Sequence, residues 1–125
     1  MATDNSLFVQ LNNVTTTSYQ NIFFRTGTST VTTDLANANG YIGVGNQDAS
    51  DTNSFAVLTI FDYANTNTHK LMQGYAYSYT GAGAHQVGFS MTAMTSGTAA
   101  VTEIDLFGSG NPTLTQGTYF LYGVK

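Results

Sequence analysis

Two carboxylates placed two residues apart are the first candidates for chemistry in this chain. Glu103 and Asp105 project from the same face of an extended strand, where their side chains lie about 7 Å apart. Such a pair can hold a cation or act in hydrolysis. We expect these two carboxylates to form an outward-facing polar edge instead, because no basic or metal-binding residue is predicted beside them.

The other polar candidates lack the partners that catalysis or metal binding needs. His69 and His85 are the only histidines, and no G-x-S-x-G sequence places a nucleophile for them. The oxygen-rich loop 46–53 lacks the ligand spacing and final Glu of an EF-hand. The glycines of 40–45 lack the Lys and the following helix of a phosphate loop. The chain contains no cysteine. We therefore predict no catalytic residue, no metal site and no cofactor.

A row of tyrosines is the most distinctive side-chain pattern. Tyr75, Tyr77 and Tyr79 alternate along one segment and share a face with Leu71. Tyrosines in such a row can fill a sandwich core, anchor a protein interface or stack on sugar rings. All three alternatives remain open from the sequence.

The segment 117–124 is apolar on both faces. Tyr119 and Leu121 alternate with Phe120, Tyr122 and Val124. An exposed edge strand of this composition would promote aggregation, so we expect it to be central in a sheet or covered by a partner chain, and integral to the fold. The predicted protein-interface residues are Tyr75, Tyr77, Tyr79, Tyr119 and Leu121.

Composition excludes several classes of function. Of the 125 residues, 3 are Lys or Arg and 7 are Asp or Glu, which gives a net charge of −4. Three cations cannot build the basic stripe that nucleic acid or an anionic membrane surface requires. No apolar run approaches the length of a spanning helix. The first residues, 1–6, lack the basic and apolar regions of a signal peptide, so we expect synthesis in a cytoplasm without export by that route.

Alternation with a period of two predicts an all-β fold. Thr, Tyr, Phe and Val are abundant, whereas the helix formers Glu, Lys and Arg are scarce. We predict one domain over 1–125, an antiparallel, jelly-roll-like β-sandwich with about eight or nine strands and little or no helix. The expected strands are 6–12, 18–25, 28–33, 40–44, 54–63, 68–79, 85–94, 99–107 and 117–124.

The same alternation predicts which side chains form the core. The expected core residues are Leu7, Val9, Leu11, Val87, Phe89, Met91, Ile104, Leu106, Phe120, Tyr122 and Val124. In 54–63 both faces are apolar, with Leu58 and Ile60 opposite Phe55, Val57, Phe61 and Tyr63. A sandwich of this size has one core layer, so such two-sided strands also indicate a surface between subunits.

Local chemistry predicts the turns. Asn12 and Asn13 can adopt left-handed conformations at low cost. The turn 37–40 ends in Gly40, which tolerates a positive φ. In the hairpin after 54–63, Asn65 shapes the turn and Lys70 is expected to meet Asp62 across it.

Three motifs in order resemble a known module. The chain reads FDYANTNTHK at 61–70, AAVTEIDLF at 99–107 and QGTYFLYGVK at 116–125. This succession resembles a β-sandwich module of tailed-bacteriophage virion proteins, in which a D-Y-A-N-T-x-x-x-K hairpin precedes an A-I-T-x-I-x-L strand and a final G-S-x-x-x-L-Y-G-I strand. Thr118 and Val124 replace the Ser and Ile that are common there. The resemblance covers about 55–125 and implies a structural role in a virion.

The resemblance leaves two functions to weigh. We expect a non-enzymatic capsid decoration, or cement, protein on the capsid exterior, which binds the major capsid protein and stabilises the assembled icosahedral shell. The chain starts at Met1 and shows no heptad or repeat from which a fibre stem would form. A homo-oligomer is expected, and a trimer would match a threefold site. The alternative is a tail-fibre or receptor-binding module that recognises a host surface glycan.

Overall fold

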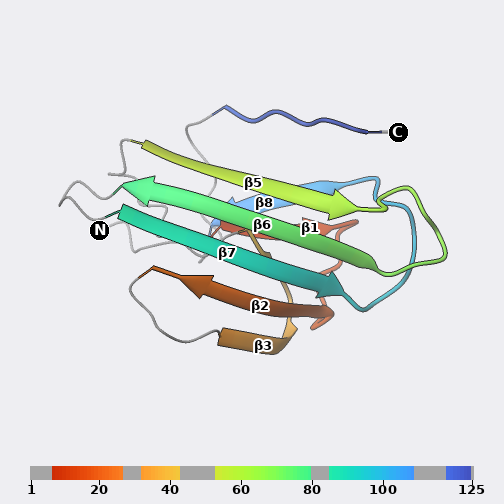
Figure 1. The fold of residues 1–125 in the computed structure, drawn as a ribbon. Helices are drawn as coiled ribbons and strands as arrows, with labels where there is room; N and C mark the ends of the chain where they lie inside the picture. Colours follow the sequence, from red (N-terminus) through yellow and green to blue (C-terminus); the bar gives the residue numbers. More distant parts are fainter. Residues whose placement is uncertain (1–6, 27–31, 43–52, 80–84, 109–117, 125) are drawn as a thin grey trace.

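The computed structural model describes residues 7–26, 32–42, 53–79, 85–108 and 118–124. These residues form eight strands and no helix, which confirms the all-β prediction (Figure 1). The described part of the chain therefore contains no helix that could span a membrane. The strands are β1 (Leu7–Leu11), β2 (Tyr19–Arg25), β3 (Thr32–Asn37), β4 (Gly40–Tyr41), β5 (Asn53–Phe61), β6 (Lys70–Tyr79), β7 (His85–Met94) and β8 (Ile104–Gly108).

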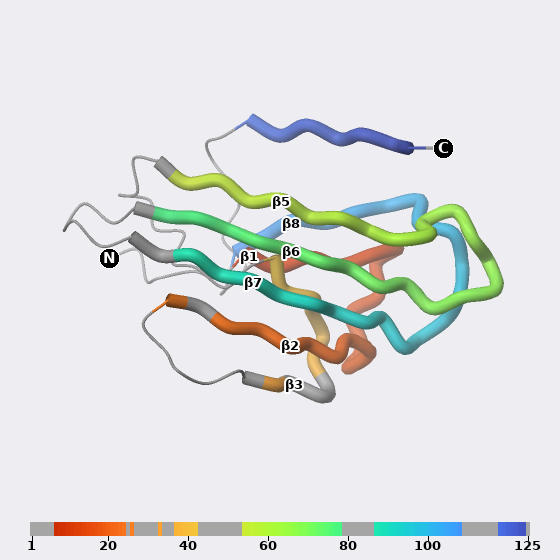
Figure 2. The backbone as a smooth tube through the Cα atoms, viewed as in Figure 1, coloured from red at the N-terminus to blue at the C-terminus, as the bar shows by residue number. Residues whose placement is uncertain are grey.

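The strands form two antiparallel sheets. One sheet has the order β4-β1-β8 and the other has the order β3-β2-β7-β6-β5. Figure 2 shows β1 and β8 lying behind the five-stranded sheet, so the two sheets make the layers of a β-sandwich. Consecutive strands β5, β6 and β7 are neighbours, and β7 also pairs with β2.

The core lies between the two layers. The buried side chains of the core are Val9, Leu11, Tyr19, Ile42, Met72 and Met94. Leu58 and Ile60 of β5 pack against this cluster. The predicted apolar face of β1 is confirmed, since Val9 and Leu11 are buried and Leu7 packs beside them. Ile104 also contacts the core, whereas Leu106 stays 39% exposed.

The prediction that Val87, Phe89 and Met91 face the core is wrong. Val87 is 50% exposed and Met91 is 38% exposed, because the alternate residues of β7 point inward. Those inward residues are Gly88, Ser90, Thr92 and Met94, all buried. Alternation defines the two faces of a strand correctly, but here the face with more apolar side chains is the outer one.

The turn after β1 is as predicted. Asn12 and Asn13 have φ values of 52° and 57°, in the left-handed region. The Asn12 side chain holds the chain that enters β8, since its Nδ2 donates to the Ala100 carbonyl and its Oδ1 accepts from the Thr102 amide. Asn12 therefore ties two segments that are about ninety positions apart.

Gly40 is needed for a different reason from the one predicted. Its φ does not lie in the left-handed region, whereas that of Gly97 is 75°. A Cβ at Gly40 would lie 2.9 Å from Val9 Cγ1, 3.0 Å from Thr92 Cγ2 and 3.2 Å from Met72 Cε. Gly40 thus lets β4 approach the core closely, and space rather than backbone conformation requires it.

The strand expected at 117–124 is not a strand of either sheet. Residues 118–124 are extended, and no hydrogen bond to any described residue involves them. Tyr119, Phe120, Leu121, Tyr122 and Val124 are 75–85% exposed. The expectation that this segment is covered inside the fold of one chain is therefore wrong. The alternative expectation, a contact with a partner chain, stays a prediction.

Candidate interaction surface

Large apolar side chains cover the side of the five-stranded sheet that points away from the core. We call this surface the outer face, and β2, β5, β6 and β7 contribute to it. Phe89 and Tyr77 are half-buried on this face. Its other large apolar side chains are each 37–56% exposed, and they are Ile22, Phe24, Phe55, Val57, Phe61, Leu71, Tyr75, Val87 and Met91.

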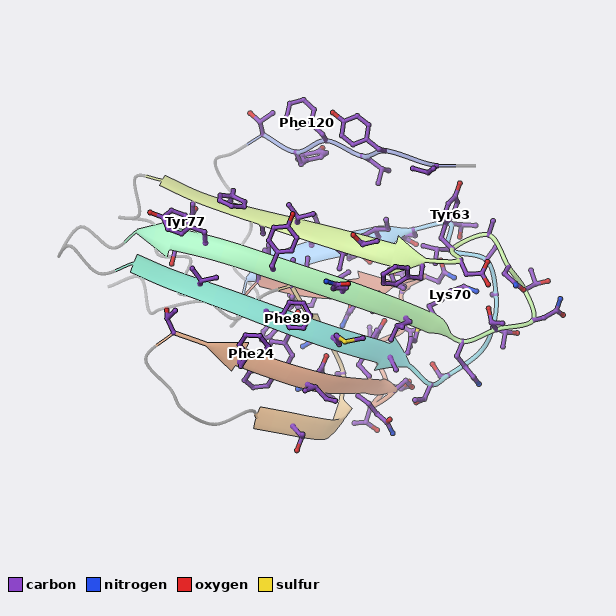
Figure 3. All side chains as sticks on the ribbon, viewed as in Figure 1. Phe24, Tyr63, Lys70, Tyr77, Phe89 and Phe120 are labelled. Carbon is purple, nitrogen blue, oxygen red and sulfur yellow. The ribbon has the colours of Figure 1, made fainter. Side chains whose placement is uncertain are left out.

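Strand register arranges the aromatic side chains of the outer face in cross-strand rows. Phe24 pairs with Phe89, and Phe89 pairs with Tyr75. The rings of Phe24 and Phe89 stack with centroids 5.1 Å apart, as Figure 3 shows on β2 and β7. Phe55 stacks on Tyr77 at 5.8 Å. Such pairs hold flat apolar surfaces in one geometry before any partner arrives.

No described side chain on the outer face is charged. The polar residues that share the face are Gln20, Gln73, Thr59 and Thr33, which are neutral. At about 150–200 Å² for a fully exposed large side chain, the nine large apolar residues present on the order of 700 Å². The largest apolar patch of a typical monomer is about 300–600 Å², so this surface has the size of a protein interface.

The inner face of the same sheet is unusually polar. Asn21 is 1% exposed, and its Nδ2 donates to the Asn39 carbonyl at 3.0 Å. Its Oδ1 accepts from Thr92 Oγ1 at 2.6 Å and from the Tyr41 amide at 3.3 Å. Ser90 Oγ donates to the Tyr41 carbonyl at 2.6 Å. This network connects β2 and β7 to β4 and fixes the register, because a slip by one residue would bury the outer face and expose these groups.

Lys70 does not meet Asp62 as predicted. It is fully buried, and its Nζ donates to the backbone carbonyls of Asn65, Thr68 and Thr98. Asp62, at φ 55°, instead accepts through Oδ2 from Asn65 Nδ2 and Thr68 Oγ1. Lys70 therefore fixes the β5–β6 hairpin to the segment after β7, a role that explains a Lys at this position without a carboxylate partner (Figure 3).

The candidates for catalysis and metal binding do not converge. Glu103 lies before β8 and accepts from Asn13 Nδ2 at 2.6 Å, while Asp105 lies in β8 opposite Gln10. His69 Nδ1 is 3.1 Å from the Gly97 carbonyl oxygen. Across the described residues, no group of three His, Asp or Glu side chains could hold a metal ion. The loop 46–52 and the His85 side chain lie outside the described part.

Among the described residues, Tyr19 carries the one clear shift in pKa, and its role is structural. Its hydroxyl accepts from the Leu11 amide at 2.9 Å and donates to the Val14 carbonyl at 3.2 Å. Burial raises the pKa of Tyr19 above its ordinary value of 10.0; the bond from Leu11 opposes this shift and the charge of Asp105 adds to it. The neutral Tyr19 hydroxyl therefore connects the start of β2 to the end of β1 and stabilises the fold near neutral pH.

The structure places the predicted interface residues on two separate surfaces. Tyr75 and Tyr77 lie on the outer face with Leu71, so they do not fill the core. The backbone of Tyr79 pairs with His85, but its side chain is outside the described part. Tyr119 and Leu121 lie in the extended segment 118–124.

Sequence reasoning missed the other half of the outer face. Ile22 and Phe24 of β2 were placed in no site, and Val87, Phe89 and Met91 were assigned to the core. A signal was present in the residues that alternate with them, because Gly88, Ser90 and Thr92 are small and polar where a core would need volume.

No family model, no curated protein and no solved structure matches this chain.

Proposed function

We propose that the chain is a non-enzymatic structural protein of a bacteriophage virion, namely a capsid decoration protein that binds the major capsid protein on the shell exterior. The uncharged, apolar outer face is the observation that carries this proposal. Its area of on the order of 700 Å² is close to the roughly 800 Å² that each partner buries in a standard protein interface. The virion as the site of action rests on the three motifs that resemble phage virion modules.

Stabilisation of the shell would follow from binding to its assembled form alone. A protein that binds only that form shifts the equilibrium toward it by the free energy of binding. Low charge supports this role, because many copies crowd around each symmetry axis.

We favour a homotrimer at threefold sites and a jelly-roll-like sandwich. The nested pairings β1–β8 and β2–β7 favour the jelly roll, although β5, β6 and β7 are consecutive neighbours.

Binding to shells tests the proposal directly. Purified protein is mixed with expanded shells that lack it, and bound protein is measured after sedimentation. A Tyr75→Lys variant places a charge at the centre of the outer face and is expected to lose at least about tenfold in affinity. Thr66→Lys adds the same charge on an exposed loop and serves as the control. Equal binding by both variants would show that the outer face does not contact the shell.

A tail-associated module that binds host glycans is the second candidate. Tyr75 and Tyr77 expose rings on the outer face beside Gln73, an arrangement that suits stacking on sugar rings with an amide for hydrogen bonds. Copy number in purified virions separates the two functions. A decoration protein is present in numbers comparable to the major capsid protein, whereas a fibre subunit is far rarer.

A further inference from the structure

The edge formed by β5 differs from the other sheet edges. Natural sheets protect their edges with short strands, charges or proline. Among the described strands, β4 has only 2 residues, β3 contains Asp34 and β8 contains Asp105. Strand β5 has 9 residues, no charge and no proline, and among the described strands it pairs only with β6. No other described strand therefore covers the outer row of backbone donors and acceptors of β5.

The segment 118–124 also has backbone donors and acceptors without partners among the described residues. Its backbone is extended and makes no hydrogen bond to the described residues. In Figure 1 this segment, coloured dark blue, lies beyond β5. A Cβ at Gly123 would lie 3.3 Å from the Tyr63 Oη, which places this part of the segment beside the residues that follow β5. Seven extended residues span about 23 Å, which β5 can accommodate along its length.

The side chains on both surfaces also correspond. Strand β5 presents Phe55, Val57 and Phe61 on the outer face and Leu58 and Ile60 toward the core. A strand added beside β5 must therefore be apolar on both sides. The segment 118–124 meets this requirement, because large apolar side chains alternate on its two sides and all are at least 75% exposed.

We propose that residues 118–124 of one copy add as a strand to the β5 edge of a second copy. The inference rests on the homo-oligomer of the proposed function and does not depend on the virion. Strand addition supplies the missing backbone hydrogen bonds, and the alternate side chains extend both the core and the outer face. The contact joins two different surfaces, so copies close into a ring or exchange segments reciprocally.

Removal of residues 118–125 tests this proposal in the purified protein, without shells. The truncated chain is expected to keep its β-sheet circular dichroism, since the segment shares no hydrogen bond with the described sandwich. Its mass by light scattering is expected to fall from a multiple of 13.3 kDa to that of a single chain. A truncated chain that keeps the oligomeric mass of the full chain would overturn the proposal, as would a full-length chain that is monomeric at micromolar concentration.

Disulfide trapping identifies the contact even if truncation prevents folding. The chain has no cysteine, so every disulfide reports an engineered pair. Leu121→Cys or Tyr122→Cys protein, which together sample both sides of the segment, is mixed with Phe55→Cys, Val57→Cys or Thr59→Cys protein. We expect at least one mixture to form a covalent dimer at least about fivefold faster than the same segment variant mixed with the Thr15→Cys control. Equal rates in all mixtures would refute strand addition to β5.

The two proposals fail in distinguishable ways. If strand addition is wrong and shell binding is right, truncation leaves the oligomeric mass unchanged and Tyr75→Lys still lowers shell binding. If shell binding is wrong and strand addition is right, the disulfide forms and Tyr75→Lys has no effect on sedimentation with shells.

Discussion

On strands β2 and β7, the inner face of the five-stranded sheet carries mainly small and polar side chains, whereas the outer face carries mainly large apolar ones. Inside, Thr92 donates to Asn21, and both Asn21 and Ser90 bond the backbone of Tyr41 in β4. Outside, Phe24, Phe89 and their neighbours have no described layer above them. Buried polar groups are retained when every bond is made, and an exposed apolar surface of this size is typical of a binding site.

The difference between the two faces indicates which interactions stabilise the fold of one chain. The hydrogen bonds and close approaches of the inner face define the fold of the monomer. The outer face contributes little to that fold and is available for association. Substitutions on the two faces should therefore differ in effect.

Asn21→Ala is expected to lower the free energy of unfolding by about 2–4 kcal/mol, measured by urea denaturation at one protein concentration. The substitution removes the buried amide that bonds the Asn39 carbonyl, the Tyr41 amide and the Thr92 hydroxyl. Gln20→Ala, one position away on the outer face, serves as the control and should change stability by less than about 0.5 kcal/mol. A similar loss in both variants would contradict the contrast between the faces.

Gly40→Ala is expected to cost about 1–3 kcal/mol, because its Cβ would meet Val9, Thr92 and Met72 in a closely packed core. Gly97 provides a control, since it has open space and a left-handed φ. Asn tolerates that conformation, so Gly97→Asn should preserve the melting temperature while Gly40→Asn should lower it strongly. A mild effect of Gly40→Asn would mean that β4 is not packed as closely as the structure has it.

Raising the pH should reveal the burial of Tyr19. Its folded pKa is raised, so the neutral form is favoured in the folded state. The associated stability is fully present below pH 10.0, the ordinary value, and is lost as the pH rises toward the folded pKa. Unfolding measured between pH 9 and 11 should therefore show a downward slope that Tyr19→Phe reduces. An unchanged slope in Tyr19→Phe would contradict the burial of this hydroxyl.

Local turn chemistry and strand periodicity could be predicted from the sequence. Asn12 and Asn13 adopt left-handed conformations because their short polar side chains can form local hydrogen bonds, which lowers the free-energy cost of that conformation. The strands β5, β6 and β7 follow from alternation alone. These features depend on near neighbours in the chain, which a sequence displays directly.

Features that depend on distant segments could not be predicted. Alternation separates the two faces of β7, but only the polar partners on β2 and β4 decide which face is inside. The sequence predicts a contact between Lys70 and the nearest carboxylate in the chain. The partners of Lys70 instead include the carbonyl of Thr98, which is 28 residues away. The segment 118–124 has strand composition without a strand partner among the described residues, and composition alone cannot distinguish a partner within the fold from one in a second copy.

The smallest expected effect on folding is that of Val57→Thr. A hydroxyl replaces a methyl group at nearly constant volume, and Val57 lies on the outer face with 37% of its surface exposed. We expect the free energy of unfolding to change by less than about 0.5 kcal/mol, because water reaches the new hydroxyl. The same substitution at Val9, which is fully buried, should cost about 1–3 kcal/mol, because the hydroxyl is desolvated there.

Shell binding should reverse this order for Val57. If a partner covers the outer face, Val57→Thr weakens sedimentation with shells severalfold while the chain stays folded. Val9→Thr lowers the melting temperature but leaves the affinity of the folded fraction unchanged. Equal stability losses at the two positions would mean that Val57 is part of the monomer's own core, and the contrast between the faces would then be lost.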